Sequence, residues 1–485
     1  MRLLKELIEA GGTRLWIGGE WREASDGASF EVLDPATGEP IASVSSGSTD
    51  DAAAAVSAAT ETAEEWAATP PRDRAEILRR AFEMMAGEAD GFAELIVAEM
   101  GKALTEARGE ATYAAEFFRW FSGEAVRNEG SLMTAPAGDK RIISIHQPVG
   151  VSLLVTPWNF PAAMATRKLG PAIAAGCTTI LKPASDTPLT ALAMARLLDE
   201  AGLPPGVLNV LPSNRSSEVV PAMLTDDRVR KLSFTGSTEV GRSLLEHSAK
   251  RVVNCSMELG GNAPFIVFGD ADLDQAVAGL MIAKMRNGGQ SCIAANRIYV
   301  EASIAEDFAS RFTAAMAAVK VGPGLDPGVE LGPVINKRAR DDMADAVERS
   351  ADAGSEVALG GSPLDRPGWF YPPTVLTDVD QSDTILSEEI FGPVAPLVRF
   401  GDEAEAIAMA NNTEHGLASY VYTTDLGRGL RVAEALEAGM VGVNRGLISD
   451  PAAPFGGVKQ SGLGREGGHQ GLHEFLETKY VSASW

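Results

Sequence analysis

The sequence has few cysteines and histidines, and those it has are scattered. Its 485 residues include three cysteines and five histidines. No two cysteines have CxxC spacing, which argues against a disulfide framework or a cysteine zinc site and fits a reducing cytoplasm. The close histidine pair His469 and His473 lacks the HExxH order. We interpret it as structural or solvated and predict no metal site.

Long apolar runs and an excess of basic residues are also missing. No segment approaches the ~18 uninterrupted apolar residues of a membrane span. The start of the chain, MRLLKELIEAGG, carries Glu6 and Glu9 within its apolar pattern, which argues against a targeting peptide and predicts a short surface helix. A net charge of −24 would repel nucleic acid. We therefore expect a cytoplasmic protein with a small-molecule partner, and neither nucleic acid nor membrane.

The middle of the chain changes from helical texture to an alternation of strands and helices. Residues 50–122 are rich in Ala and Glu and predict two or three long helices. After them come short strand-like runs separated by helical segments: VSLLV (151–155), TTIL (178–181), VLNVL (207–211) and KLSF (231–234). This spacing predicts βαβ units and a doubly wound parallel sheet.

A second alternation begins at PFIVF (264–268) and continues through a predicted helix over 272–286 to RIYV (297–300). It predicts a second α/β domain. The C-terminal EFLETKYVSASW predicts a final strand.

Two glycine-rich motifs could bind phosphate. GSTEVGRS (236–243) differs from a nucleotide-triphosphate loop by Arg242 in place of lysine, and it joins a strand to a helix N-terminus, which favours an anion. This context alone does not separate ATP from a dinucleotide. GLGREG (462–467) fits the GxGxxG fingerprint, but only 18 residues (485 minus 467) follow it, too few for a Rossmann unit. We expect a loop there.

Three residues have the chemistry of a covalent catalyst. Cys292 lies among small residues in RNGGQSC, where a substrate could approach a thiolate; Glu258 follows an apolar run in MELGGN; and Asn159 is held between prolines in TPWNFP. They could serve as nucleophile, general base and oxyanion donor. Each also has a plain structural alternative: an inert buried thiol, a buried salt bridge, or a turn-forming asparagine.

The motifs occur together in a known order. TPWNFP, LKPAS, FTGSTEVG, MELGGNAPFIV, GGQSC and EEIFGP resemble the aldehyde dehydrogenase superfamily in order and spacing over nearly the whole chain, and the fuller strings look most like its succinate-semialdehyde dehydrogenases. The resemblance implies a Rossmann-like cofactor domain (1–124 and 146–259) and a catalytic domain (260–460). It also implies a small β oligomerisation element (125–145 and 461–485) that joins a homodimer or homotetramer.

The resemblance also implies a mechanism at matching positions. The Cys292 thiolate would attack the aldehyde, and the Asn159 amide with the Cys292 backbone N–H would stabilise the oxyanion. After hydride transfer to a nicotinamide, Glu258 would activate water to hydrolyse the thioester.

The same resemblance assigns the cofactor site. Gly236 and Ser237 would lie against the pyrophosphate, Lys182 would reach the adenosine ribose, and Glu389 would hold the nicotinamide ribose. The neighbouring cofactor residues are Thr156, Trp158 and Phe391. Ser185 stands where NAD-preferring relatives commonly carry a glutamate that repels a 2′-phosphate. We predict that NADP is preferred and that NAD is a second usable cofactor.

For the substrate, Arg167, Arg286 and Ser449 match the residues with which succinate-semialdehyde enzymes bind a distal carboxylate, which suits arginine's planar fork. Either arginine could instead form a structural ion pair. Ala294 stands where some relatives carry a second, regulatory cysteine. Arg445 is an additional cation that could admit a longer substrate such as glutarate semialdehyde, which is the alternative we keep.

Rival classes have weaker support. A thiol hydrolase would need a histidine partner for Cys292, and none lies in a recognisable motif. A P-loop ATPase would need the missing lysine. A structural role alone is disfavoured because nucleophile, base and oxyanion donor are all present.

Overall fold

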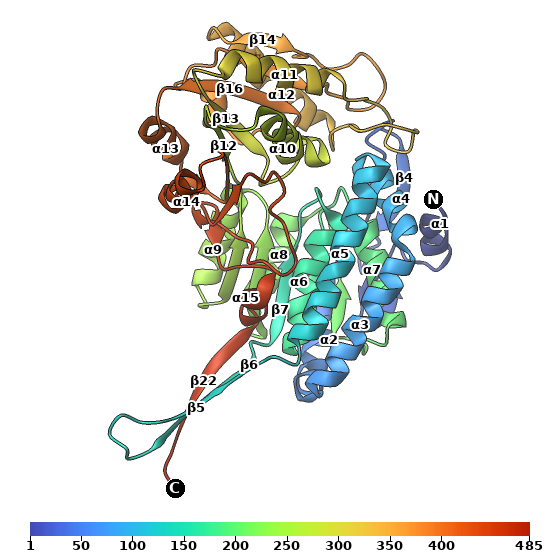
Figure 1. Ribbon diagram of the computed structural model, residues 1–485. Helices are drawn as coiled ribbons and strands as arrows, with labels where there is room; N and C mark the ends of the chain where they lie inside the picture. Colours follow the sequence, from blue (N-terminus) through green and yellow to red (C-terminus); the bar gives the residue numbers. More distant parts are fainter.

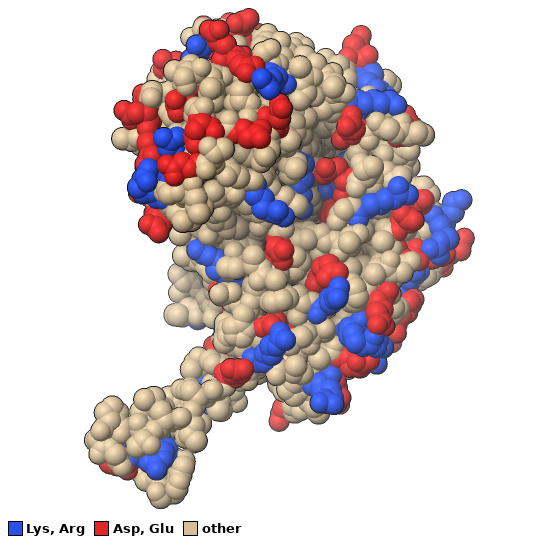
Figure 2. Space-filling model, viewed as in Figure 1, with Lys and Arg blue, Asp and Glu red and all other residues tan.

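The computed structural model describes residues 1–485 as two α/β bodies and a projecting β arm (Figure 1). The lower body holds the N-terminus and most of the first half of the chain, the upper body holds the segments from about residue 263 to residue 443, and the C-terminal residues return to the lower body and the arm. Charged side chains cover both bodies, whereas the arm shows few (Figure 2). None of the helices combines the length and apolarity that a membrane crossing would require.

The lower body is built on an eight-stranded sheet in the order β2-β1-β9-β8-β7-β10-β11-β21. Its central five strands, β9 to β11, run parallel. This confirms the predicted doubly wound sheet, and all four predicted strands are present. The strands are β1 Leu15–Ile17, β2 Glu20–Arg22, β7 Val151–Val155, β8 Thr179–Lys182, β9 Leu208–Val210, β10 Val229–Thr235, β11 Asn254–Glu258 and β21 Gly462–Leu463.

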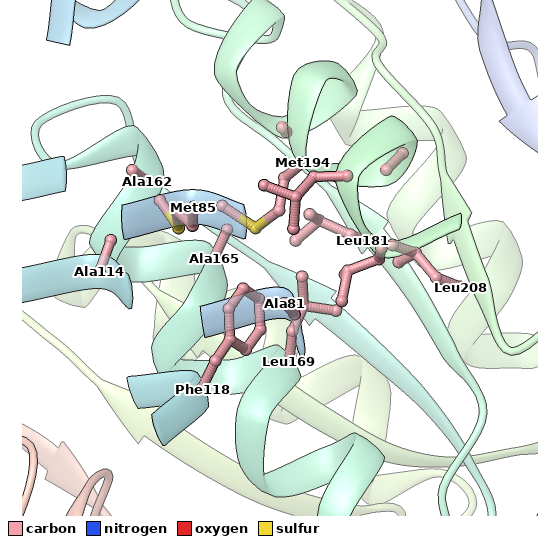
Figure 3. Close-up of a cluster of buried hydrophobic side chains, with 14 of the residues drawn as sticks. Ala81, Met85, Ala114, Phe118, Ala162, Ala165, Leu169, Leu181, Met194 and Leu208 are labelled. Atoms are coloured by element: carbon pink, nitrogen blue, oxygen red, sulfur yellow. The ribbon is translucent and has the colours of Figure 1, made fainter. Parts of the chain in front are cut away.

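Nine helices accompany this sheet. The region predicted to hold two or three long helices contains four, because Pro71 starts α3 and Gly101, with φ of 90°, ends α4. Small residues let the helices pack closely, as Ala81 and Ala114 show beside Phe118 and Leu169 (Figure 3). The helices are α1 Arg2–Glu9, α2 Thr49–Ala68, α3 Pro71–Gly87, α4 Ala89–Met100, α5 Leu104–Glu124, α6 Pro161–Ala175, α7 Leu189–Glu200, α8 Ser216–Thr225 and α9 Thr238–Ala249.

The upper body is a second α/β unit, as predicted. Its seven-stranded sheet has the order β14-β15-β16-β13-β12-β18-β19, parallel except for the β14–β15 pair. The strands are β12 Ala263–Val267, β13 Ala295–Glu301, β14 Glu356–Leu359, β15 Thr374–Thr377, β16 Val394–Phe400, β18 Ala418–Tyr422 and β19 Met440–Val443. The helices are α10 Leu273–Met285, α11 Ala305–Ala317, α12 Lys337–Asp352, α13 Glu403–Asn411 and α14 Leu426–Ala435, with the 3-10 turns η1 Arg286–Gly289 and η2 Thr384–Leu386.

The arm is a three-stranded sheet of β5 Ser131–Thr134, β6 Arg141–Pro148 and β22 Leu476–Ala483, in the order β22-β6-β5. The predicted C-terminal strand is therefore present. Between the arm and the upper body, β21 joins the lower sheet and α15 Gly468–His473 packs against α6. Two short pairs complete the fold: β3 Ser29–Leu33 with β4 Pro40–Ser45, and β17 His415–Gly416 with β20 Val458–Lys459. The domain boundaries set from the sequence stay a prediction.

Candidate active site

The strand order of the lower sheet creates a crevice beside β7. The chain proceeds from β7 to β8 and β9 on one side and returns to β10 and β11 on the other. In open α/β sheets, ligands bind outside the carboxyl ends of the strands at such a reversal of strand order. The predicted TPWNFP, GSTEVG and MELGGN motifs begin at or just after the ends of β7, β10 and β11. Sequence segments that are far apart thus meet at one edge.

A cleft of about 200 Å³ lies at this edge and brings together all three predicted catalytic residues, Asn159, Glu258 and Cys292. Five of the predicted cofactor residues line the same cleft: Trp158, Gly236, Ser237, Glu389 and Phe391.

Cys292 lies just after η1 in a loop that packs tightly on the MELGGN segment. A Cβ on Gly261 would come within 2.2 Å of the Cys292 carbonyl oxygen, so only glycine permits this approach. Burial, followed by the charge of Glu258, raises the pKa of the Cys292 thiol well above its usual value. The thiol is therefore protonated at rest, and a base must take its proton before it can attack.

Glu258 is the last residue of β11 and is 2% exposed. Its carboxyl group makes no ion pair, and Cys292 is the neighbouring side chain whose hydrogen bond lowers its pKa. Burial, and next the negative charge of Glu466, raise the pKa of Glu258 to about 8. An unpaired buried carboxyl group with a pKa near neutrality has the properties of a general base.

Asn159 is fixed by a buried network. Its side-chain Nδ2 donates to the backbone carbonyl oxygen of Gln290 at 3.1 Å. The backbone carbonyl oxygen of Asn159 accepts from Lys102 Nζ and Asn287 Nδ2, both at 2.8 Å. Lys102 also pairs with Glu110 at 2.5 Å. The second amide proton of Asn159 remains available for an oxyanion in the cleft.

Sequence reasoning missed the residues of this network. Lys102 and Glu110 lie in the helical amino-terminal region, 8 positions apart. Glu110 also accepts from the N–H groups of Ala162 and Ala163 at the start of α6, at 2.9 and 3.3 Å. An oppositely charged pair in an Ala-rich helical region gives no sign of burial, since such pairs are usual on helix surfaces.

The glycine turn lies at the amino end of α9, where free N–H groups and the helix dipole favour an anion. Gly236 N–H donates to the Glu258 carbonyl oxygen at 3.1 Å, and the Ser237 hydroxyl caps the helix by accepting from Val240 N–H. Arg242 bonds Gln460 and lies near Glu414 on the surface. It therefore occupies no lysine-like position in the turn.

Glu389 and Phe391 close the cleft from the upper body. Glu389 accepts from the Gly261 N–H at 3.0 Å, and burial raises the pKa of Glu389 to about 7. The Phe391 ring meets the Trp158 ring edge to face, with centroids 5.4 Å apart.

Three predicted cofactor residues lie outside this cleft. Thr156 is buried and donates its N–H to the Lys182 carbonyl oxygen at 3.2 Å. Burial lowers the pKa of Lys182 to about 8. Ser185 lines a separate cleft with Asp186 and Glu99, and burial raises the pKa of both carboxyl groups.

A second, larger cleft of about 540 Å³ holds two of the predicted substrate residues. Arg286 Nη1 donates to the Ser449 hydroxyl at 3.2 Å, and its guanidinium lies 4.9 Å from the Phe160 ring centroid and 5.6 Å from that of Tyr113. The two clefts share no lining residue, but consecutive residues connect them, because Asn159 lines the first and Phe160 the second.

Arg167 is 2% exposed and lines neither cleft. Its Nη2 donates to the Tyr113 hydroxyl at 2.8 Å, and Glu466 lies 3.6 Å from Nη1. Its Nε and Nη1 have no hydrogen-bond partner. The positive charge of Arg167 acts on both Glu258 and Cys292, which places it close to the reacting groups.

Other residues singled out in the sequence have structural contacts. Glu466, in the GLGREG loop, binds Lys168 at 2.5 Å. Arg445 is exposed and donates to the Leu447 carbonyl oxygen at 2.8 Å. His469 lies 2.6 Å from Glu124, and the Nε2 atoms of His469 and His473 are 2.9 Å apart.

Residues 21–481 match the sequence model of the aldehyde dehydrogenase family. The chain belongs to the aldehyde dehydrogenase family. A succinate-semialdehyde dehydrogenase of Paenarthrobacter nicotinovorans is 55% identical to it over 441 residues, 91% of this chain and 98% of that protein. A glutarate-semialdehyde dehydrogenase of Pseudomonas putida is 50% identical over 469 residues, 97% of each chain.

Among solved structures, one described as an Escherichia coli NADP-dependent enzyme is 48% identical, covers 98% of both chains and has a TM-score of 0.96. These findings confirm the family and the α/β fold that the sequence predicted. This aldehyde dehydrogenase has Cys292, Glu258 and Asn159 in one cleft, and their roles as nucleophile, base and oxyanion donor stay predictions.

Proposed function

We propose that this dehydrogenase oxidises a short aldehyde with a distal carboxylate, succinate semialdehyde in the first place, to the dicarboxylic acid, and that it prefers NADP. The observation that carries the proposal is the pair of arginines that meet at Tyr113, next to the catalytic cleft. Arg286 and Arg167 both contact Tyr113, and Arg167 is buried with two nitrogen atoms unpartnered. Glu466 lies 3.6 Å from Nη1 of Arg167, so the cation open to a substrate carboxylate is Arg286, whose planar guanidinium lines the second cleft.

The residues of the first cleft fit a nicotinamide dinucleotide. The turn of Gly236 and Ser237 at the N-terminus of α9 suits a pyrophosphate, and a Cβ at Gly236 would clash with the Phe234 ring at 2.5 Å. The Glu389 carboxyl group keeps one oxygen without a protein partner for a ribose hydroxyl. When bound, a nicotinamide cofactor supplies this site with a hydride acceptor.

The protein's own groups divide the remaining work. Glu258 takes the thiol proton, and Cys292 Sγ bonds to the aldehyde carbon while the oxygen becomes an oxyanion. Asn159 Nδ2 and the Cys292 backbone N–H donate to that oxyanion. After Glu258 has passed the thiol proton on to solvent and the adduct has become a thioester, its carboxylate takes a proton from water, whose oxygen attacks the same carbon. The C–S bond then breaks, which releases the acid and leaves Cys292 as a thiolate that is protonated again.

Two observations favour glutarate semialdehyde as a second substrate. The Pseudomonas putida relative carries that name, and the cleft holding Arg286 has a volume of about 540 Å³, against about 200 Å³ for the catalytic cleft. A thiol hydrolase is disfavoured because no histidine lines either cleft.

The experiment is a set of initial rates at 340 nm with succinate semialdehyde, glutarate semialdehyde and butanal, each with NADP and with NAD. A maximum for succinate semialdehyde with NADP supports the proposal. A maximum for glutarate semialdehyde would transfer it to the longer substrate, and equal rates with butanal would remove the carboxylate from recognition.

The arm supports assembly through copies of this chain. It exposes Leu132, Met133, Tyr480 and Trp485, which is unusual for a surface that stays in water. We propose a cytoplasmic homodimer or homotetramer joined through β5 and β22, which sedimentation of the full chain would test.

A further inference from the structure

Tyr113 occupies a central position between the two substrate-site arginines, and no sequence motif marks it. It lies on α5, is partly buried and lines the second cleft with Arg286. The guanidinium of Arg286 is 5.6 Å from its ring centroid and that of Arg167 is 5.9 Å away. One aromatic side chain thus contacts both cations.

The hydroxyl group of Tyr113 accepts a hydrogen bond within the protein but donates none. It accepts a hydrogen bond from Arg167 Nη2 at 2.8 Å, and no protein atom accepts its own proton. A phenol that accepts from a cation is polarised and becomes a better donor, because hydrogen bonds in a chain strengthen one another. The group that would complete this chain is an anion in the second cleft.

We propose that Tyr113 is a third carboxylate-recognition residue, whose hydroxyl donates to the distal carboxylate of the substrate while it holds Arg167 in place. This inference rests on the proposed function and deepens it. Arg286 and Ser449, which are hydrogen-bonded to each other in the same cleft, would contact the carboxylate alongside it. Three different donors around one carboxylate would favour a carboxylated aldehyde over an uncharged one of similar length.

Tyr113→Phe tests the donor because it removes the hydroxyl and keeps the ring. A hydrogen bond to a charged group has the strength to lower kcat/KM for succinate semialdehyde about 10- to 100-fold. With butanal, kcat/KM should change less than about twofold, because butanal has no carboxylate to bind. Tyr371→Phe is the matched control, because Tyr371 lines neither cleft and its hydroxyl has no hydrogen-bond partner; it should leave both values unchanged.

A double variant separates donation to substrate from mere support of Arg167. In an Arg167→Met background, Tyr113→Phe should cause a further fall with succinate semialdehyde if the hydroxyl contacts the substrate itself. No further fall would show that Tyr113 acts only through Arg167 and would overturn the proposal. Equal losses with both aldehydes in the single variant would overturn it as well.

Failure of the underlying function has a different signature. If the wild-type enzyme shows no preference for succinate semialdehyde over butanal, both the proposed function and the role of Tyr113 are refuted before any variant is measured. If the wild type has the preference and Tyr113→Phe keeps it, only the role of Tyr113 is refuted.

Discussion

Replacing Asn159 by alanine should selectively remove transition-state stabilisation. The Asn159 amide donates one proton to the Gln290 carbonyl oxygen, and the other is free in the cleft with Cys292. Loss of one oxyanion donor typically lowers kcat about 10²- to 10³-fold, or about 2.7–4 kcal/mol. We therefore expect a fall of this size in kcat, with a KM close to that of the wild type.

The structural cost of Asn159→Ala should be small. The Gln290 carbonyl oxygen keeps a second donor, Asn287 Nδ2 at 2.9 Å, and Lys102 binds the backbone carbonyl of residue 159, which the substitution retains. Only one neutral hydrogen bond is lost, worth about 1 kcal/mol.

Steady-state rates at 340 nm, together with the rate of Cys292 alkylation by iodoacetamide, would test this prediction. Alkylation should proceed at the wild-type rate, since it forms no oxyanion. Asn411→Ala is the control, because Asn411 also donates its amide to a backbone carbonyl but lies outside both clefts. A loss below about fivefold in kcat would refute the oxyanion role.

Three further predictions follow from the site and its supports. The rate constant kcat/KM should rise with pH through about 8, because burial raises the pKa of Glu258 and only its carboxylate form is a base. A Glu258→Gln variant that kept this rise in its pH-rate profile would contradict the role of Glu258 as the base. Ser185→Glu should lower kcat/KM for NADP about tenfold or more and leave kcat/KM for NAD unchanged, because a carboxylate repels the 2′-phosphate. An equal fall in kcat/KM for both cofactors would argue against Ser185 as a determinant of cofactor choice. Glu110→Ala should lower the free energy of unfolding in urea by about 3–5 kcal/mol, because it leaves Lys102 buried without its partner. Glu116→Ala on the same helix breaks only an exposed pair and should cost at most about 1 kcal/mol. Similar urea midpoints for the two variants would contradict this prediction.

Six core strands could be predicted from the sequence, because each is a short apolar run between turns, whereas β14, β15, β16, β18 and β19 of the upper sheet were not predicted. β7 begins and ends where VSLLV was predicted to, and β12 differs by one residue at each end from PFIVF. The number of amino-terminal helices was harder to predict. Their breaks at Pro71 and Gly101 lie within one continuous Ala-rich pattern, and where such a pattern breaks depends on tertiary packing.

The catalytic trio could be proposed from motifs because each residue is surrounded by glycine, proline or small residues that only a site requires. The residues that hold the trio could not. Glu110, Lys102 and Tyr113 lie in the helical amino-terminal region without any local signal, and their role depends on contacts with α6 and η1 that only the folded chain creates. For the same reason, the position of Arg167 outside both clefts could not be predicted from its motif.

Arg286, in the cleft next to the catalytic one, is the residue that we propose selects a carboxylated aldehyde. The most direct test is the ratio of kcat/KM for succinate semialdehyde to that for butanal, measured in the wild type and in Arg286→Ala. Since Arg286 lines the second cleft and is bonded there to Ser449, its loss should lower this ratio at least about tenfold and leave the butanal value nearly unchanged. An unchanged ratio, with both aldehydes affected equally, would contradict the account.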